Sequence, residues 1–319
     1  MELIAISKWK PIYSMPLWHN PHEIFAPEFN TGTRFRLVLV ERGTGILRFA
    51  ERRRSFIAPA LFCLNEREAV ALEQSLDLQA QALYFHPHLV NHQFTFERIR
   101  NNLEDLTPTQ RRDWSWLRPF LQRDAAYDGY MSIGPSIHLR ISSLLDAIGH
   151  QIVEQEDAYW SCRSVSFLLE LLLLVSRLLY TPREGAVPAN SLPDLDGEVD
   201  PIVLYLHTHY QQKITIAELT RRFHTNRTTL SERFREATGM PVMAYLIQLR
   251  INLAATMLRD TGLLVTEIRR RVGFSDDSHF RRTFRKYMGA SPGEYRQHHG
   301  SGWWRPSVAG HAESPGALG

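Results

Sequence analysis

Cysteine is scarce in this chain, because only Cys63 and Cys162 occur among its 319 residues. Two cysteines cannot form the disulfide framework of a small secreted protein, so a reducing, cytoplasmic setting is expected. The first residues also lack the basic and apolar regions of a secretory signal peptide. Together these absences point away from the secreted classes.

Long apolar runs are also missing. The longest, Val165–Tyr180, is interrupted by Glu170 and Arg177 and is shorter than the roughly 20 apolar residues that a membrane span needs. No membrane partner is therefore expected. With 44% apolar and 22% charged residues, the composition is that of an ordinary globular chain with one or two domains and a sizeable core.

Histidines are present without the spacing of an enzymatic metal site. The His-x-His triplets His86–His88 and His207–His209 are not followed by the glutamate and histidine that would complete a metal-binding cluster in a β-barrel enzyme. His19 and His22 flank a loop. The sequence therefore predicts no bound metal, no cofactor, no catalytic residues and no enzymatic activity.

Charge is distributed unevenly along the chain. Residues 181–199 hold three prolines and two glycines without apolar periodicity, which predicts a linker between two domains. The formal net charge is +3, but residues 213–299 carry +8, residues 1–212 carry −5, and the tail 300–319, predicted to be flexible, sums to zero. A compact basic module beside an acidic one favours a polyanionic partner for the basic end.

The basic module contains an internal repeat, in which residues 216–239 recur at 265–289. Each copy predicts two short helices joined by a tight turn, with the second helix capped by Asn226 or Asp276. A glycine then ends that helix, Gly239 or Gly289. The recurring apolar and glycine positions, at an offset of 49 or 50, are Leu219 with Ile268, Leu230 with Phe280, Phe234 with Phe284, and Gly239 with Gly289.

The second helix of each copy has a polar outer face, estimated at about 100° per residue. These side chains suit the reading of DNA base edges in the major groove: Thr228, Ser231 and Glu232 in the first copy, and Ser278, Arg281 and Arg282 in the second. Nearby cations suit phosphate contacts: Arg227, Arg235, Arg285, Lys286 and Arg296. Residues 243–259 predict a stiff helical spacer that would hold the reading helices about 34 Å apart.

Residues 200–299 resemble the DNA-binding domain of AraC/XylS-type transcriptional regulators. The resemblance rests above all on the second copy, with Ile268, Val272–Phe274, Phe280, Arg282, Phe284, Gly289, Ser291–Pro292 and Tyr295–Arg296 in the order of the family. The chain departs from the family at Thr220 and Arg269, where alanine is usual, and at Glu232, where a basic or uncharged polar residue is usual. No operator sequence can therefore be transferred from the family.

The acidic half has a different pattern. Residues 33–85 read as short strands separated by turns, typical of an antiparallel sandwich or barrel. The expected strands are Arg36–Glu41, Ile46–Phe49, Ser55–Ala58, Leu61–Leu64 and Leu76–Phe85, with a turn at Arg42–Gly45 and helices following at Pro108–Asp124 and Ser136–Tyr180. This order resembles the cupin-like sensor domain of AraC-type regulators. It implies an α+β, multidomain chain in which residues 1–180 bind an effector and dimerise.

An effector site is expected where aromatic and hydrogen-bonding side chains gather, a mixture that suits a sugar or a polar aromatic compound. The candidates are Trp9, Tyr13, Trp18, His19, Arg34, Arg36, Tyr84 and His86. By resemblance, residues 1–20 are placed to form an arm over the mouth of the barrel. The leucine-rich stretch from Leu168 to Leu179 is apolar on more than one side, which fits either a core helix or a homodimer contact; the resemblance favours the dimer.

The resemblance implies a ligand-responsive regulator that controls the catabolism of a carbohydrate or another small molecule. It favours an activator over a repressor. Its partners would be direct-repeat half-sites in double-stranded promoter DNA, a small effector, RNA polymerase and a second copy of the chain. Two alternatives stay open at this point. One is a cupin-type metalloenzyme fused to a DNA-binding domain, and the other is a constitutive dimeric DNA-binding protein without an effector.

Overall fold

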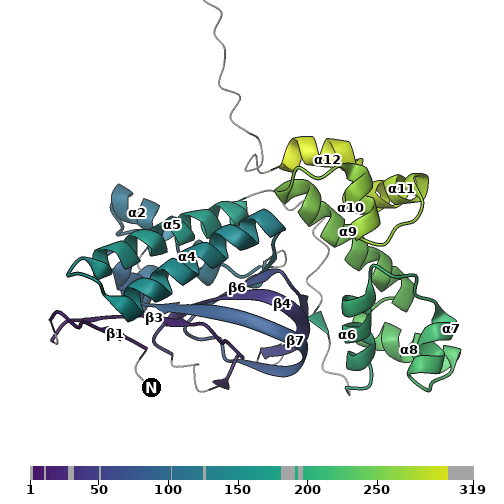
Figure 1. The fold of residues 1–319 in the computed structure, drawn as a ribbon, viewed down its shortest axis with the longest axis horizontal. Coiled ribbons are helices and arrows are strands. Elements are labelled where there is room, and N and C mark those ends of the chain that lie inside the picture. Colours follow the sequence, from purple (N-terminus) through teal and green to yellow (C-terminus); the bar gives the residue numbers. More distant parts are fainter. Residues whose placement is uncertain are drawn as a thin grey trace, which may run out of the picture.

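The computed structural model describes residues 3–10, 12–27, 32–49, 52–101, 103–124, 127–180, 191–192 and 197–300. Most of the predicted linker and all of the predicted tail beyond Gly300 lie outside the described residues. A curled β-sheet, covered on one face by helices α4 (Pro135–Glu154) and α5 (Trp160–Tyr180), forms the N-terminal half, and a group of helices forms the C-terminal half (Figure 1). The predicted α+β fold class is confirmed.

The sheet is antiparallel, with the order β3-β7-β4-β5-β9, while β6 pairs with β4 and β8. Its strands are β3 (Leu17–Asn20), β4 (Phe35–Phe49), β5 (Arg52–Ile57), β6 (Ala60–Leu64), β7 (Val70–Phe85), β8 (Tyr130–Ser132) and β9 (Ser191–Leu192). A separate two-stranded hairpin joins β1 (Ala5–Ile6) to β2 (Ser14–Met15).

The predicted turn at Arg42–Gly45 is wrong, because β4 runs through it as one strand. The pairing of β4 with β7 shifts register between Val40 and Thr44, so the strand bends at a bulge instead of reversing. Gly43 has φ +91°, and a Cβ there would lie 2.4 Å from the Asp77 carbonyl oxygen. The two halves of β4 pair with different strands, β6 and β5. The sheet therefore curls into the structure that we call the barrel.

The two faces of the sheet bury different cores because side chains alternate along each strand. The outer face lies under α4 and α5 and includes Leu37, Leu39 and Leu83. The inner face fills the barrel with Val38, Val40, Phe56, Phe62 and Tyr84 among others. A shift of one residue in any strand would exchange these two sets of side chains.

The helices predicted at Pro108–Asp124 and Ser136–Tyr180 are each broken. The first is α2 (Pro108–Ser115) followed by α3 (Arg118–Leu121). The second breaks after α4, because Gln155 adopts the left-handed conformation with φ +47°. The Gln155 side-chain amide donates to the Ile6 carbonyl at 2.8 Å and its Oε1 accepts from the Lys8 amide at 2.7 Å. This contact with the β1–β2 hairpin offsets the strain of the break.

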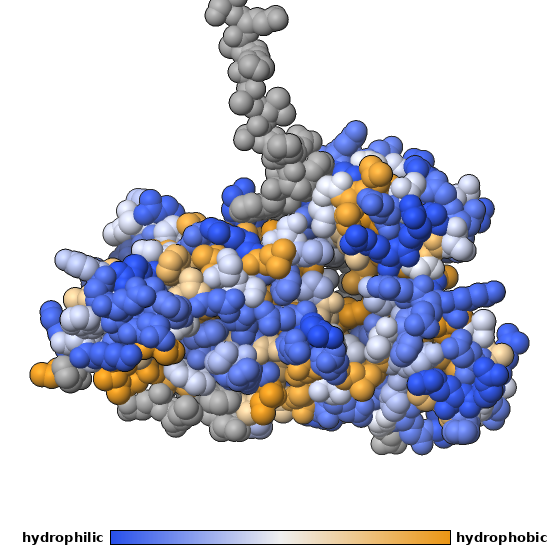
Figure 2. Space-filling model, in the orientation of Figure 1, coloured by the Kyte–Doolittle hydropathy of each residue, from blue (hydrophilic) through white to orange (hydrophobic). Residues whose placement is uncertain are grey.

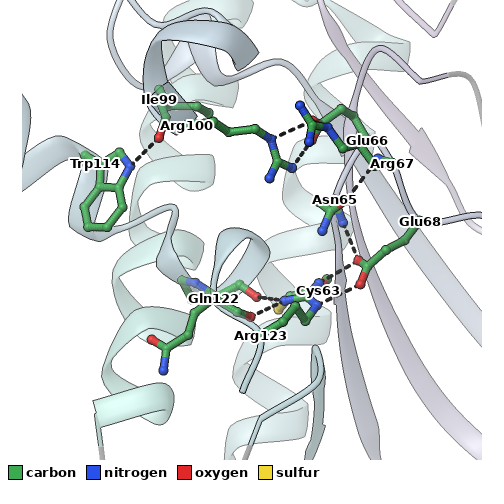
Figure 3. Close-up of polar contacts among 11 residues, drawn as sticks. Cys63, Asn65, Glu66, Arg67, Glu68, Ile99, Arg100, Trp114, Gln122 and Arg123 are labelled. Carbon is green, nitrogen blue, oxygen red and sulfur yellow. Dashed lines mark hydrogen bonds and ion pairs between the residues drawn. The ribbon is translucent and has the colours of Figure 1, made fainter. Parts of the chain in front are cut away.

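Ion pairs join the helical segments between β7 and β8 to the turn between β6 and β7 (Figure 3). Arg100, in α1 (Phe96–Asn101), holds the Glu66 carboxylate with Nε at 2.9 Å and Nη2 at 2.8 Å. Arg123 holds Glu68 at 2.7 and 2.6 Å and also donates to the Cys63 carbonyl at 2.7 Å. Two-pronged arginine contacts of this kind fix orientation as well as position, so this edge of the barrel is rigidly held.

The C-terminal half is all helical. It comprises α6 (Asp200–His209), α7 (Ile216–Arg222), α8 (Arg227–Thr238), α9 (Val242–Asp260), α10 (Val265–Arg271), α11 (Asp277–Met288) and α12 (Pro292–His299). Val199 is the N-cap of α6, and Asp200 is its first helical residue. The Asp200 carboxylate pairs with Arg53 of the barrel. Among the described residues no single helix is long and apolar enough to cross a membrane, although α8 and α9 together, bent by 48°, pass the same test of length and composition.

Candidate nucleic-acid interface and effector pocket

Two helix-turn-helix units are formed by α7 with α8 and by α10 with α11. The predicted caps are confirmed: Asn226 Oδ1 accepts from the Thr229 amide at 2.9 Å, and Asp276 Oδ1 accepts from the His279 amide at 2.6 Å. The helices end at Gly239 and Gly289, which have φ +75° and +74°. The second helices, α8 and α11, have the same length and lie 50 residues apart in the sequence.

Each unit has its own buried core. Leu230 and Phe234 anchor α8 in one cluster, and Phe280 and Phe284 anchor α11 in another. Helix α9 belongs to both clusters, since Tyr245 lies in the first and Leu258 in the second. The predicted helical spacer is therefore present, and its buried contacts at both ends fix the two units relative to one another.

The predicted base-reading and phosphate-binding side chains of α8 and α11 are exposed. They are Arg227, Thr228, Ser231, Glu232 and Arg235 on α8 and Ser278, Arg281, Arg282, Arg285 and Lys286 on α11. The surface of this half is largely hydrophilic on the side away from the barrel (Figure 2). Arg281 is already oriented, because its Nε donates to the Asp277 carboxylate at 2.6 Å one helical turn away.

Arg296 occupies a different environment from the other predicted phosphate contacts. Its guanidinium donates to the Leu263 carbonyl, which precedes α10. Burial lowers the pKa of Arg296 from its ordinary value. The structure therefore uses Arg296 to tie α12 to the start of the second unit, and it does not present the side chain on the exposed face.

Three of the eight predicted effector residues meet inside the barrel. Trp18, Tyr84 and Arg36 form a row across β3, β7 and β4, because Tyr84 pairs with both of the others. The rings of Trp18 and Tyr84 lie 5.4 Å apart between centroids, and the Arg36 guanidinium lies 5.9 Å from the Tyr84 ring. All three belong to the face that fills the barrel.

Glu23, which is not among the residues predicted from the sequence, completes this group. Its carboxylate is only 1% exposed and accepts a hydrogen bond from the Tyr84 hydroxyl at 2.5 Å. Burial, followed by the negative charge of Glu23, raises the pKa of Tyr84 above its ordinary value, while Arg36 acts in the opposite direction. We call Glu23, Arg36 and Tyr84 the polar cluster. In the sequence, the feature that could have indicated a role for Glu23 is that this carboxylate lies beside two apolar residues, Ile24 and Phe25.

His19 and His86 lie outside the barrel interior, contrary to the expectation. His19 follows Trp18 in β3, so its ring points to the outer face and nests on α4, where a Cβ at Gly149 would lie 2.3 Å from it. Burial lowers the pKa of His19 and the hydrogen bond with Gln81, 2.9 Å long, opposes that change. His86 accepts from the His88 amide at 3.1 Å, and burial together with the charge of Arg34 lowers its pKa to about 4.

The remaining candidates lie on the N-terminal arm or at the start of β4. Trp9 is 54% exposed and donates to the Gln155 carbonyl at 2.6 Å, and Tyr13 packs edge-on against Trp160. Arg34 donates to the Leu3 carbonyl at 3.3 Å. The arm therefore lies against the end of the α4–α5 layer, and of its described residues Leu3 joins the barrel core. These candidates do not share one pocket with Arg36.

Comparison with known proteins agrees with this arrangement. A family model described as a helix-turn-helix domain matches residues 219–298. The HTH-type transcriptional activator RhaR of Cronobacter sakazakii is 25% identical over 284 residues, which cover 88% of this chain and 90% of RhaR. RhaR of Escherichia coli K12 is 24% identical over 279 residues, 86% of this chain and 88% of RhaR. The DNA-binding domain of AdpA, solved with a target DNA, is 29% identical and covers 32% of this chain and 92% of its own, with a TM-score of 0.30.

The chain therefore carries a helix-turn-helix domain and is similar over most of its length to transcriptional activators such as RhaR. The relatives just described are named as transcription activators and not as enzymes. In the part of the chain that the structure describes, no group of three or more His, Cys, Asp or Glu side chains is arranged to hold a metal ion.

Arg269 is one of the positions where the sequence departs from the AraC-type pattern that it resembles. The guanidinium Nη1 donates to the carbonyls of Phe274 and Ser275, at 2.6 and 2.5 Å. These carbonyls form the turn between α10 and α11. A long side chain where alanine is usual therefore supports the turn that sets the direction of α11.

Proposed function

We propose that this regulator reads two successive major grooves with α8 and α11, and that an effector bound inside the barrel controls that reading. The observation that carries the DNA-binding part is the twofold occurrence of one exposed polar face on helices fixed to a common spacer. The N-terminal ends of such helices approach base edges, and one helical turn of DNA separates their half-sites. Direct repeats in promoter DNA would suit two units that follow each other along one chain.

The proposed division of labour follows from side-chain chemistry. Arg282 suits guanine and Glu232 suits the amino group of cytosine, while Thr228, Ser231, Ser278 and Arg281 supply further contacts to bases. Arg227, Arg235, Arg285 and Lys286 are assigned to phosphates, where they set position without reading sequence. Arg296 is not included among the proposed phosphate contacts, because its guanidinium donates to the Leu263 carbonyl.

The proposed effector is a sugar or a polar aromatic compound. Trp18 and Tyr84 offer aromatic faces, and Arg36 with Glu23 offers a donor and an acceptor beside them. The proposal extends to activation of catabolic genes through RNA polymerase, to a homodimer formed through the sensor half and to a cytoplasmic location. The activator role is supported by the names of the RhaR relatives.

Replacing Arg282 by alanine is expected to weaken binding to the specific site by about 1–3 kcal/mol and to relax the preference at one base. Lys286→Ala is the matched control, since a phosphate contact contributes about equally on specific and random DNA. It should also lower the salt slope by about one. Binding titrations on both DNAs at several salt concentrations measure these effects. Equal losses on specific and random DNA for Arg282→Ala would refute base reading by this residue.

A barrel effector is expected to raise the melting temperature of the wild-type protein, because a ligand at 100 times its Kd stabilises the folded state by about 2.7 kcal/mol. A thermal-shift screen of sugars and aromatic acids measures this. Trp18→Leu should abolish the shift, while Trp116→Leu, on the outer side of the sheet, should keep it. A shift that survives Trp18→Leu would place the effector elsewhere, and a stoichiometric transition metal in the purified protein would favour a cupin-type enzyme instead.

A further inference from the structure

The C-terminal half is docked on the barrel through a buried histidine. His207 of α6 is 2% exposed and lies among residues of the barrel. Thr44 Oγ1 donates to the Phe56 carbonyl at 2.5 Å, so His207 Nδ1, 2.9 Å from the same Oγ1, is the donor of that pair. His207 Nε2 then accepts from the Tyr245 hydroxyl at 2.7 Å. We call Thr44, Phe56, His207 and Tyr245 the latch.

Charged residues next to the latch add further contacts between α6 and the barrel. Arg53 of β5 donates to Glu73 at 2.6 Å and also pairs with Asp200, the first residue of α6. Gln74 donates to the same Asp200 carboxylate at 3.2 Å. Helix α6 consequently stands against the edge of the barrel formed by β4 and β7 (Figure 1). Buried polar contacts of this density specify one relative position of two packed surfaces.

The other side of Phe56 faces the barrel interior. Its ring lies 6.3 Å from the ring of Phe25, and Phe25 lies 5.6 Å from Phe62. Phe25 is fully buried, yet it comes from a loop and not from a strand, and its φ is +56°. A non-glycine residue in that conformation is strained unless its surroundings hold it there. The Glu23 carboxylate does so by accepting from the Phe25 amide at 2.5 Å.

Phe25 also covers the polar cluster, since the Arg36 guanidinium lies 5.9 Å from its ring. The strand side chains around it are fixed by the sheet and are fully buried. A molecule that pairs with Arg36 and Glu23 would therefore have to displace the side chain that a loop supplies. Its displacement would remove the packing partner of Phe56, whose carbonyl accepts the hydrogen bonds of the latch.

We infer that Phe25 is a displaceable plug in the barrel, and that its insertion holds Phe56 in the position that keeps the latch closed. Entry of the effector expels the plug, loosens the latch and frees α6 with the DNA-binding units from the barrel. The effector half of this inference rests on the proposed function. The coupling between Phe25 and α6 does not, because it is a property of the chain alone.

Hydrogen exchange of the full-length protein without ligand tests the coupling. In Phe25→Ala the amides of α6 should exchange at least about five times faster than in the wild type, because local opening becomes easier. Phe35→Ala is the matched control, since Phe35 is equally buried but lies on the outer face. It should loosen the helical layer and leave α6 unchanged. Tyr245→Phe, which removes the hydroxyl that His207 accepts from, should also accelerate α6.

Equal α6 exchange in Phe25→Ala and Phe35→Ala would overturn the inference. If Phe25→Ala does not fold, Phe25→Leu supplies the same comparison with a smaller cavity, and an unchanged α6 rate in that variant would overturn it equally. A ligand that shifts the melting temperature should accelerate α6 in the wild type and add nothing in Phe25→Ala. Faster α6 exchange in Phe25→Ala, with no ligand response in the wild type, would uphold the coupling and reject the effector part of the proposed function.

Discussion

The free energy of unfolding should fall by about 3 kcal/mol between pH 6.5 and pH 4 on account of His207 alone. Burial lowers the pKa of His207 from 6.5 to about 4, with the Phe56 carbonyl opposing the change. Above pH 6.5 the imidazole is neutral in both states and contributes no pH dependence. As the pH falls below 6.5 the unfolded chain takes up the proton first, so stability is lost until the folded protein is protonated near pH 4.

Denaturant unfolding across this pH range measures the effect as the difference between wild type and His207→Asn, which retains polar atoms but does not titrate. The difference cancels the carboxylates, which titrate in the same window. His86→Asn is a second case, because the pKa of His86 is also lowered to about 4, so its difference curve should fall in the same pH window. A difference curve for His207→Asn that is flat between pH 6.5 and pH 4 would contradict the burial of a neutral His207.

The helix-turn-helix units could be predicted from the sequence because their determinants are local. Asn226 and Asp276 act within one turn of their helices, and the pairs Leu230–Phe234 and Phe280–Phe284 have helical spacing. Local signals of this kind survive without knowledge of the tertiary structure. The internal repeat then predicted similar polar side chains on the outer faces of α8 and α11.

The grouping of candidate effector residues inside the barrel was predicted only in part, because strand register decides which side chains meet there. Trp18 and His19 are adjacent in the sequence and both have aromatic rings with an N–H group, yet they lie on opposite faces of β3. Trp18 pairs with Tyr84 and faces the interior, whereas His19 pairs with Leu83 and faces the helices. Residue type alone does not predict which face each side chain occupies. Glu23 was missed because nothing local distinguishes it from a surface carboxylate.

The docking of the two halves could not be predicted at all. In the sequence, His207 is one member of a His-x-His triplet, and Asp200 is a carboxylate before Pro201. Both contact β-strands about 150 residues away, His207 through Phe56 and Asp200 through Arg53. Contacts between two domains produce no periodic pattern in the sequence of either domain. They can therefore be recognised only when the structures of both domains are known.

A second point of docking, at the far end of α9, carries the largest expected loss of stability. The Asp260 side chain is fully buried; it accepts from Arg259 at 2.7 Å and from the Gly134 amide at 2.9 Å, at the N-cap of α4. A Cβ at Gly134 would lie 2.4 Å from that of Asp260, so only glycine allows this approach. Asp260→Ala should destabilise the protein by about 3–5 kcal/mol, because it removes the carboxylate that pairs with the largely buried Arg259.

A double-mutant cycle separates the charge from the cap. If the isolated guanidinium causes most of the loss, Arg259→Met combined with Asp260→Ala should be more stable than Asp260→Ala alone, since an apolar pair removes the uncompensated charge. Glu170→Ala is the control, because the Glu170–Arg140 pair is about half exposed and its removal should cost at most about 1 kcal/mol. Additive effects at 259 and 260 in urea unfolding would show that Asp260 acts through Gly134 alone. The junction between α9 and α4 would then depend on one hydrogen bond, and not on a buried ion pair.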